Sequence, residues 1–530
     1  MRRTAATLTA TLALLAGGLA AAPSSPAADR QAASGSAASG LGDTVARAAV
    51  TTRDACITSV PEPGATAKVD ICYTVFKPRA ATKKRPVPMI MHSHGWGGKR
   101  AEQPEIQAWL DAGYGVLSFD QRGFGTSGGH AHVEDPTLEG RDVRGLVKVV
   151  AGLPWVQQDG PGDPRMGAIG GSYGGGYQYV GAFELLRLKG KPVFDALSPQ
   201  ITWHDLSQSL APSGVVRTEW ALALSAASLI SDALPVNVYK ALLEGAALGV
   251  WPDGSIPGTE DMVSFFRKNG PKWHVEHGRR LDIPMLLGQG TTDGLFPLEQ
   301  GFRNWKRAMT AKARRQSIFV AYNGGHVLPA ILPAGTTADT DPCSRKLAGG
   351  DFEKLNIRFF DQVLRGRRTG LRGFGKMHLA TPGDRCTTIA TPQANTAKKI
   401  GTVATLEGVG TPLSYPVAAG PIRVAGTPYL TGRLTALGLQ NRAFYGLAVG
   451  RTPLDARLVQ NNVLPINEPT PVLGEKRRVA LPSVAVDVPK GQHLYLMVTP
   501  ISDTFLLMGS RLPGVVTIED TVVHLPVVGR

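Results

Sequence analysis

The fold is decided by Met166-Gly167-Ala168-Ile169-Gly170-Gly171-Ser172-Tyr173-Gly174-Gly175-Gly176. A short apolar run ends there in Gly-x-Ser-x-Gly and leads directly into an apolar, helix-like stretch from Tyr177 to Leu188. This order predicts a strand, a sharp turn and a helix. Glycines two positions to either side of Ser172 carry no Cβ atom, so the strand and the helix can pass closely. A glycine-rich loop with an incidental serine is the alternative, but both flanks favour an exposed, nucleophilic hydroxyl at Ser172.

Strands and helices alternate around this turn. Val87–His92 and Gly115–Phe119 are short apolar runs that precede it, and helical stretches follow each of them. Alternation of this kind indicates crossover units and a parallel sheet. Ligands bind beyond the carboxyl ends of such strands. The glycine-rich turns at His94, Arg122 and Ser172 all follow strands, so we expect them at the ligand-binding edge.

The alternation stops after a strand at Val193–Leu197 and resumes with Pro284–Gly288 and Ser317–Ala321. Helical stretches rich in Ala and Leu fill the interval at about 200–280, and we expect them to form a cap over the site. From residue 376 to residue 530, short strands rich in Val, Leu and Thr alternate with Pro/Gly turns. That pattern is typical of an all-β sandwich or jelly roll.

The predicted fold class is therefore α/β, with two folded domains. The first is a catalytic domain at 53–375 that is built on a parallel sheet and carries the cap insertion. The second is a C-terminal β-sandwich or jelly-roll domain at 376–530. A chain of 530 residues is long enough for such a division.

The first 52 residues are predicted to lie outside both domains. Arg2 and Arg3 precede an apolar run from Leu8 to Ala22 and a small-residue region, which together predict a cleaved signal peptide at 1–28. A retained membrane anchor is the alternative, but the run is too short to span a bilayer. Residues 29–52 are rich in Ala, Ser and Gly and predict a flexible leader. We therefore expect a secreted protein without stable membrane insertion.

The chain is basic, with a formal net charge of +15. Such a balance can attract nucleic acid or an anionic envelope. However, the basic residues are scattered, and their densest runs are short and carry no interleaved aromatic residues. We therefore expect the charge to give solubility and a loose attraction to anionic surfaces, and we do not expect nucleic-acid binding.

The chain contains four cysteines: Cys56, Cys72, Cys343 and Cys386. An even number in an exported chain suggests two disulfides. Three pairings are possible, and proximity in the sequence favours Cys56–Cys72 and Cys343–Cys386. No Cys-x-x-Cys pair occurs, so we do not expect a zinc or redox cysteine site, and the chemistry below needs no metal or organic cofactor.

A serine nucleophile needs a base that takes its proton and an acid that orients the base. In a fold of this kind the chain order is nucleophile, acid, histidine. His326 follows a late strand in a glycine-rich turn, where the base is expected. Asp293 follows the strand before it and is expected to be the acid. Asp195 lies inside a strand and is the reserve candidate.

The oxyanion of a tetrahedral intermediate needs two preorganised hydrogen-bond donors. The backbone N–H of Tyr173, directly after the nucleophile, is expected to be one of them. The other is expected from the loop His94-Gly95-Trp96, which follows an early strand. The indole N–H of Trp96 can also donate, but we favour its backbone amide.

Three motifs together resemble the X-prolyl dipeptidyl-peptidase and cocaine-esterase family. They are Asp120-x-Arg122-Gly123-x-Gly125-x-Ser127-x-Gly129, Leu153-Pro154-Trp155 and Gly170-x-Ser172-Tyr173-Gly174. In architecture the resemblance covers roughly residues 55–530. It implies an α/β-hydrolase with a helical cap and a C-terminal jelly roll. It also implies hydrolysis of ester or amide bonds through an acyl-enzyme, with Ser172, Asp293 and His326 in the matching roles.

One loop departs from the family's pattern. Members of the family often carry a tyrosine in the oxyanion loop, and its hydroxyl is the second donor, whereas this chain has Trp96. The departure favours a broad acyl hydrolase acting on a small ester, an amide or a short peptide. An exopeptidase of the X-Pro dipeptidyl-peptidase type is one alternative. A catalytically silent protein that binds the cell envelope through its β domain is the other.

Overall fold

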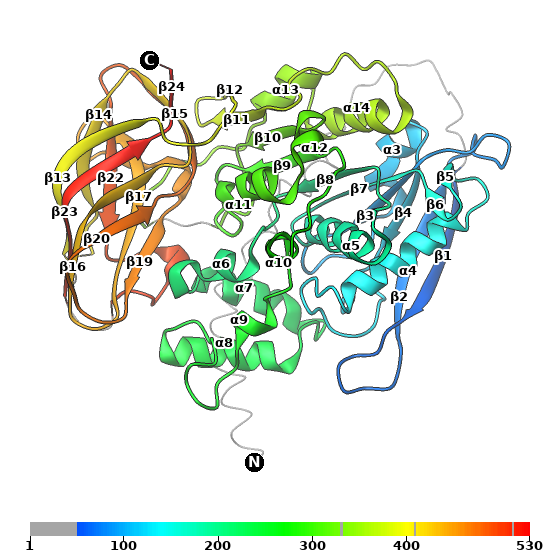
Figure 1. The fold of residues 1–530 in the computed structure, drawn as a ribbon, viewed down its shortest axis with the longest axis horizontal. Coiled ribbons are helices and arrows are strands. Elements are labelled where there is room, and N and C mark those ends of the chain that lie inside the picture. Colours follow the sequence, from blue (N-terminus) through cyan, green and yellow to red (C-terminus); the bar gives the residue numbers. More distant parts are fainter. Residues whose placement is uncertain (1–49, 329–331, 407–409, 511–513, 530) are drawn as a thin grey trace, which may run out of the picture.

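The computed structural model describes residues 50–328, 332–406, 410–510 and 514–529. The predicted signal peptide at 1–28 and all but the end of the predicted leader at 29–52 lie outside the described residues. A ten-stranded sheet with helices on both faces stands beside a group of antiparallel sheets (Figure 1). This arrangement confirms the predicted α/β-hydrolase fold with a C-terminal all-β part.

The large sheet has the strand order β1-β2-β4-β3-β7-β8-β9-β10-β11-β12. From β4 to β11 neighbouring strands run parallel, whereas β1, β2 and β12 are antiparallel to their neighbours. The carboxyl ends of the parallel strands therefore meet at one edge. The strands are β1 (Thr51–Ser59), β2 (Val69–Lys77), β3 (Met89–Ser93), β4 (Gly115–Phe119), β7 (Met166–Gly171), β8 (Ala196–Gln200), β9 (Leu286–Gly290), β10 (Ile318–Tyr322), β11 (Met377–Thr381) and β12 (Arg385–Ile389).

Helices cover both faces of this sheet because its strands are apolar on both sides. Met91 and Ala168 belong to the hydrophobic core under α4 and α5, whereas their neighbours Ile90 and Ile169 belong to the core under α3 and α14. Successive side chains of a strand point to opposite faces, which separates the two cores. The helices are α3 (Gln107–Asp111), α4 (Glu139–Ala151), α5 (Tyr173–Lys189), α11 (Leu298–Arg303), α12 (Ala311–Arg315), α13 (Pro342–Ala348) and α14 (Phe352–Arg365).

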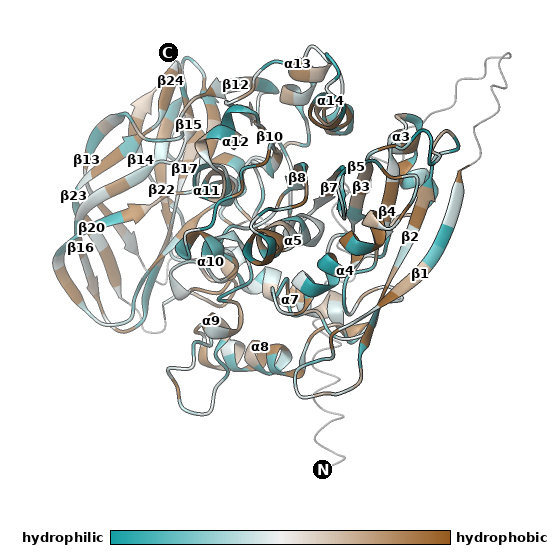
Figure 2. Ribbon diagram, turned by 45° about the vertical axis from the view of Figure 1, so that its right-hand side comes forward, coloured by the Kyte–Doolittle hydropathy of each residue, from teal (hydrophilic) through white to brown (hydrophobic). Residues whose placement is uncertain are grey.

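The segment between β8 and β9 is helical, in the interval predicted for the cap. Figures 1 and 2 both show α8 and α9 at the end of the molecule opposite α13 and α14. Apolar side chains of this segment form one core with residues of the loops beside Ser172, among them Phe124 and Tyr173. The helices are α6 (Leu206–Leu210), α7 (Thr218–Leu229), α8 (Val236–Leu248), α9 (Met262–Phe265) and α10 (Pro271–Glu276).

The C-terminal part consists of antiparallel sheets that pack face to face. Leu430 and Ile518 of one sheet share a core with Leu447 and Leu496 of another, as expected for a sandwich. The strands are β13 (Thr396–Leu406), β14 (Leu413–Ala419), β15 (Ile422–Gly426), β16 (Tyr429–Leu437), β17 (Asn441–Gly450), β18 (Arg457–Leu458), β19 (Leu464–Glu468), β20 (Val472–Ala480), β21 (Val484–Val488), β22 (His493–Thr499), β23 (Val515–Leu525) and β24 (Val527–Gly529).

The structure differs from the predicted domain boundary at 375/376. Strands β11 and β12 complete the large sheet, since β11 pairs in parallel with β10 and β12 pairs antiparallel with β11. The predicted boundary was set where helical stretches stop in the sequence. A short strand looks the same in sequence whichever sheet it joins, so this criterion assigned β11 and β12 to the second domain. We propose that the hydrolase domain extends to Ile389 and that the β-sandwich begins with β13.

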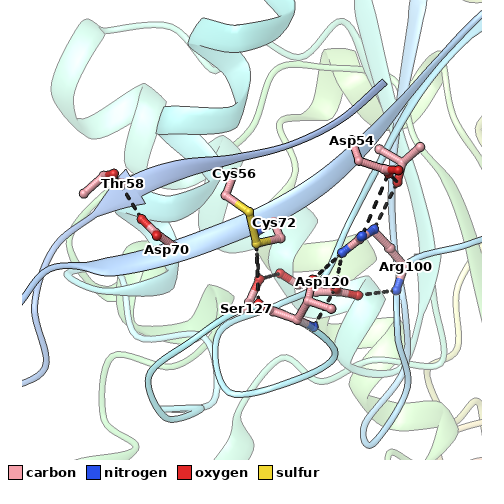
Figure 3. Close-up of a disulfide and its surroundings, with 10 residues drawn as sticks. Asp54, Cys56, Thr58, Asp70, Cys72, Arg100, Asp120 and Ser127 are labelled. Carbon is pink, nitrogen blue, oxygen red and sulfur yellow. Dashed lines mark hydrogen bonds and ion pairs between the residues drawn. A yellow bond between two sulfur atoms is a disulfide. The ribbon is translucent and has the colours of Figure 1, made fainter. Parts of the chain in front are cut away.

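Two disulfides stabilise the hydrolase domain, with the pairing that proximity favoured. Cys56 and Cys72 are register partners on β1 and β2 (Figure 3). Cys343 and Cys386 join α13 to the edge strand β12. Both bridges therefore fasten edge elements of the large sheet.

The loop of the Asp120-x-Arg122 motif lies next to the first disulfide, as Figure 3 shows. Asp120 accepts hydrogen bonds from the backbone N–H of Thr126 (2.9 Å) and from Arg100 Nη1 (2.5 Å). Ser127 Oγ accepts the N–H of Cys72 at 2.8 Å. These contacts give Asp120 and Ser127 a structural role in fixing the loop after β4.

Candidate active site

Ser172 lies in a strained turn between β7 and α5. Its φ is 57° and its ψ is −121°, a combination that is costly for a residue with a side chain. The flanking glycines make the turn possible, because a Cβ atom on Gly174 would lie 2.4 Å from the carbonyl oxygen of Ser93. On Gly170 it would lie 2.5 Å from the carbonyl oxygen of Gly174. The turn places Ser172 at the carboxyl edge of the sheet.

The structure brings the three predicted residues into one hydrogen-bonded chain. His326 Nε2 lies 2.8 Å from Ser172 Oγ, and His326 Nδ1 lies 2.7 Å from Asp293 Oδ2. Asp293 and His326 come from the turns after the adjacent parallel strands β9 and β10. The arrangement allows His326 to take a proton from Ser172 while Asp293 holds the ring nitrogen on the other side.

Asp293 is fully buried and fixed from several directions. Its Oδ1 accepts the backbone N–H groups of Leu295 (3.0 Å) and Phe296 (2.7 Å), which leaves Oδ2 for His326. Gly325 has a φ of 106°, and a Cβ atom there would lie 2.8 Å from the Cβ of Asp293. The glycine before the histidine is therefore needed for the close approach of the two turns.

Tyr173, whose backbone N–H is the first expected oxyanion donor, directly follows the nucleophile. Tyr173 is the first residue of α5, so its N–H has no carbonyl partner within the helix. The partial positive charge of the helix N-terminus favours a developing negative charge at this point.

The loop that carries Trp96 lies beside the nucleophile. A Cβ atom on Gly95 would lie 3.8 Å from the Cβ of Ser172. The indole Nε1 of Trp96 donates to the carbonyl oxygen of Leu224 (3.0 Å) and to Ser228 Oγ (2.8 Å), both on the cap helix α7. Because the indole N–H is used in this way, the backbone amide of Trp96 is the better candidate for the second donor.

His94 shapes the same loop. Its Nε2 accepts the backbone N–H of Gln121 at 3.1 Å, so Nδ1 carries the proton and donates to the carbonyl oxygen of Gly95 at 2.7 Å. Burial lowers the pKa of His94, which favours the neutral ring that this pattern needs. His94 therefore orients the loop and does not compete with His326 as the base.

Aromatic side chains from the cap and the core surround the site. Trp220 of α7 and Phe296 meet the ring of His326 edge to face, with centroid distances of 5.7 and 5.2 Å. Trp96 meets Tyr173 in the same way at 4.9 Å. The sequence did not reveal the role of Trp220, because the apolar residues of α7 do not gather on one periodic face that would indicate which of them point to the core.

Arg122 of the Asp120-x-Arg122 motif forms a buried ion-pair network away from the nucleophile. Its Nε and Nη2 each donate to Asp142 at 2.9 Å, and its Nη1 donates to Glu62 at 2.8 Å. The network ties the loop after β4 to α4 and to the loop after β1, which is a structural role. Within the described segments, no group of three or more His, Cys, Asp and Glu side chains is placed to hold a metal ion.

Comparisons with known proteins give a family match and a shared fold. Residues 68–327 match the family described as X-Pro dipeptidyl-peptidase (S15 family). Of the curated proteins, none matches the sequence. No helix in the described part of the chain is long and apolar enough to cross a membrane.

Several solved structures share the fold over nearly the whole chain. A CocE/NonD family hydrolase from Staphylococcus aureus is 14% identical, with a TM-score of 0.58 over 90% of this chain and 93% of that one. An aminopeptidase from a Thaumarchaeota archaeon is 12% identical, with a TM-score of 0.59 over 93% and 99%. An α-amino acid ester hydrolase is 13% identical, with a TM-score of 0.58 over 92% and 98%. At these identities the likeness shows the fold alone.

Proposed function

Because residues 68–327 of this chain belong to the X-Pro dipeptidyl-peptidase (S15) family, the chain is a serine hydrolase, and we propose that Ser172, His326 and Asp293 are its catalytic triad. The proposed reaction is hydrolysis of an ester or amide bond through an acyl-enzyme. The observation that carries the proposal is the continuous hydrogen-bonded chain from Ser172 to His326 to Asp293, with distances of 2.8 and 2.7 Å.

In the proposed mechanism, Ser172 Oγ attacks the substrate carbonyl carbon and passes its proton to His326 Nε2. The carboxylate of Asp293 faces the resulting imidazolium and stabilises it. The backbone N–H groups of Tyr173 and Trp96 donate to the oxyanion. His326 then gives the proton to the leaving group, the C–O or C–N bond breaks, and a water molecule repeats the sequence on the acyl-enzyme.

The surroundings of the triad favour an uncharged, apolar substrate group. Aromatic rings from Trp96, Tyr173, Trp220 and Phe296 stand around Ser172 and His326. Apolar walls of this kind bind apolar groups and exclude the water that a charged group would need. We therefore propose that the favoured substrates are small esters or amides with an apolar acyl group.

One observation favours the alternative of an X-Pro dipeptidyl-peptidase. Glu219 precedes Trp220 on α7, and its Oε2 is buried without a hydrogen-bond partner among the described residues. Burial raises its pKa, and a neighbouring cation would reverse that effect. A carboxyl group here is a candidate for holding the amino terminus of a peptide substrate.

The two functions are separated by testing two substrates side by side with the purified mature protein. A short-chain p-nitrophenyl ester reports esterase activity, and Ala-Pro-p-nitroanilide reports dipeptidyl-peptidase activity. Ester cleavage alone supports the main proposal, whereas clear anilide cleavage supports the alternative. If neither substrate is cleaved, labelling of Ser172 by a fluorophosphonate would show that the triad is active and that its substrate is a different one. Absence of labelling would support a catalytically silent binding protein.

We also propose that the protein is secreted. The sequence pattern at 1–28 predicts a signal peptide. The chain also contains two disulfides, and disulfides form and persist mainly in oxidising compartments such as the cell exterior. N-terminal sequencing of protein recovered from culture medium tests this proposal. A mature chain that begins near residue 29 is expected, and retention of Met1 in the cell fraction would contradict it.

A further inference from the structure

Helix α11 lies on the side of the hydrolase domain that faces the β-sandwich (Figure 1). A groove at this place is lined by residues of both parts. It consists of two cavities of about 290 and 570 Å³. Both cavities are lined by Glu299, Arg303, Thr427 and Arg478, so they lie next to each other. The size is typical of sites for small ligands.

The groove is rich in cations that lack an acidic partner. Among the described residues, none of the following lining side chains takes part in an ion pair: Arg217, Arg303, Lys306, Arg307 and Arg478. Two acids also line the space. Glu468 is paired with Arg477, which is a lining residue as well, and Glu299 accepts the backbone N–H of Ser483 at 3.3 Å. The charge of the groove is therefore positive.

Arg217 is the most unusual of these cations. Its side chain is almost completely buried, and its Nη1 has no hydrogen-bond partner in the described part of the chain. Its Nε donates to the carbonyl oxygen of Ser209 at 3.0 Å, and its guanidinium lies 5.0 Å from the ring centre of Phe505. Burial lowers the pKa of Arg217 to about 10, although the carboxylates of Glu299 and Asp293 oppose this effect. An anion in the groove would accept the unused N–H groups of Nη1 and offset the cost of burying the charge.

Arg303 and Arg478 are held in place but keep donors free. Arg478 lies with its guanidinium 3.6 Å from the ring centre of Tyr429. A guanidinium that stacks through its face keeps its edge N–H groups for hydrogen bonds. Arg303 donates through Nη1 to Gln208, which leaves its other N–H groups for a ligand. Such prepositioned guanidinium groups suit the paired oxygens of phosphate and carboxylate.

We propose that this groove binds a small ligand that carries two or more phosphate or carboxylate groups. Arg303 and Arg478, which border both cavities, bind one anionic group, and Arg217 binds another at the inner end. None of Ser172, Asp293 and His326 lines the groove. The proposal is therefore independent of the proposed function, and a failure of either leaves the other standing.

The test is calorimetric titration of the full mature protein with tripolyphosphate and, separately, with citrate, at low and high NaCl concentration. We expect binding of at least one of the two anions that weakens with salt. The double variant R303Q/R478Q is expected to weaken binding by about 100-fold, since each charged hydrogen bond that is lost costs about tenfold. The single variant Arg217→Met, which keeps an apolar stem of similar length, is expected to weaken it by about tenfold.

The matched control is R345Q/R367Q, which removes the same amount of charge from exposed ion pairs with Asp384 and Asp361. It is expected to bind the anions like the unmodified protein. Melting temperature and ester hydrolysis are measured for every variant, so that a folding defect is recognised. If Arg217→Met does not fold, R303Q/R478Q alone decides the result.

Tighter binding of tripolyphosphate than of citrate would identify a phosphate ligand, and the reverse order a carboxylate ligand. The proposal is overturned if neither anion binds. It is also overturned if R303Q/R478Q binds as well as the unmodified protein, or if the control weakens binding to the same extent.

Discussion

Ser172 combines a strained backbone with a hydroxyl that lies 2.8 Å from Nε2 of His326. The change Ser172→Ala removes the nucleophile but keeps the turn, because alanine has the same Cβ atom at the same φ of 57°. We expect kcat/KM for the ester to fall by about 10³-fold or more, with an unchanged melting temperature. Fluorophosphonate labelling is expected to disappear. Ser255→Ala, at an exposed turn of the cap, is the control, and wild-type turnover in Ser172→Ala would refute the triad.

Asp293→Asn tests the orientation of the base. The backbone N–H groups of Leu295 and Phe296 need an oxygen at Oδ1, so the amide nitrogen of asparagine would face His326. That nitrogen is a donor and would stabilise the wrong tautomer of the ring. We expect kcat to fall by about 10³- to 10⁴-fold while KM changes little. Steady-state kinetics check this, and a loss of less than tenfold would show that Asp293 does not orient the base. The reserve candidate Asp195 is ruled out by its place, because it precedes β8 at the opposite edge of the sheet and accepts the backbone N–H of Met166 at 2.8 Å.

Glu134 is a buried acid that links stability to pH. Both of its carboxyl oxygens lack a hydrogen-bond partner among the described residues, and burial together with Glu139 and Asp142 raises its pKa well above 4.5. A raised pKa means that the folded state holds a proton that the unfolded state releases above about pH 4.5. The contribution of Glu134 to stability is therefore lost progressively as the pH rises above that value.

The change Glu134→Gln keeps the shape of the protonated acid and removes its titration. We expect the variant to melt at the same temperature as the wild type near pH 4 and at a higher temperature at pH 8. Thermal melts across this pH range check the prediction. Glu276→Gln, at an exposed position of α10, is the control. An equal difference in melting temperature at both pH values would show that charge is not the cause.

At the level of elements, the cap helix α7 is tied to the oxyanion loop. Trp96 Nε1 donates to Leu224 and Ser228 of α7, and the backbone amide of Trp96 is a proposed oxyanion donor. Trp96→Phe keeps a ring but removes these hydrogen bonds. Since the amide acts on charge that develops in the transition state, we expect kcat to fall by about tenfold and KM to change much less. A change confined to KM would show that Trp96 serves only as a wall of the pocket.

The elements around the nucleophile were predictable because their signals are local. Gly-x-Ser-x-Gly specifies the turn at Ser172 because glycines at these positions avoid steric clashes. Asp293 and His326 could be chosen because the acid and the histidine follow the nucleophile in that order, each in the turn after a strand. The contacts of the cap were not predictable, because α7 has no single apolar face and its sequence does not show that Trp220 meets His326 or that Ser228 meets Trp96. The assignment of β11 to the sandwich was wrong, since its pairing with β10 is a long-range contact that the local pattern of a strand does not encode.

For the molecule as a whole, the β-sandwich supports the cap. Val215 and Val216, just before α7, share an apolar cluster with Phe444, Phe505 and Met508 of the C-terminal part. Helix α7 also carries Trp220, which contacts His326, and the hydrogen-bond partners of Trp96. We therefore expect the position of the sandwich to affect the placement of both tryptophans. Residues of the second domain should therefore influence catalysis without touching the substrate.

Arg442 gives the most direct test of this connection. It is fully buried on β17, and its Nη2 donates at 2.8 Å to the carbonyl oxygen of Gly249, at the end of the cap helix α8. Its Nη1 donates to the carbonyl oxygen of Met508 at 3.3 Å. Arg442→Met keeps an apolar stem but leaves these buried carbonyl groups without their donor, which we expect to lower the free energy of unfolding by about 2 kcal/mol or more.

Because α8 belongs to the cap, we also expect Arg442→Met to raise KM for the ester several-fold. Chemical denaturation and steady-state kinetics on the same preparation check both effects. Arg433→Met, at an exposed position on strand β16 of the other sheet, is the control and should change neither quantity. A loss of stability without any change in KM would mean that the sandwich stabilises the chain but does not position the cap. If neither quantity changed, the hydrogen bond to Gly249 would not couple the two parts in solution.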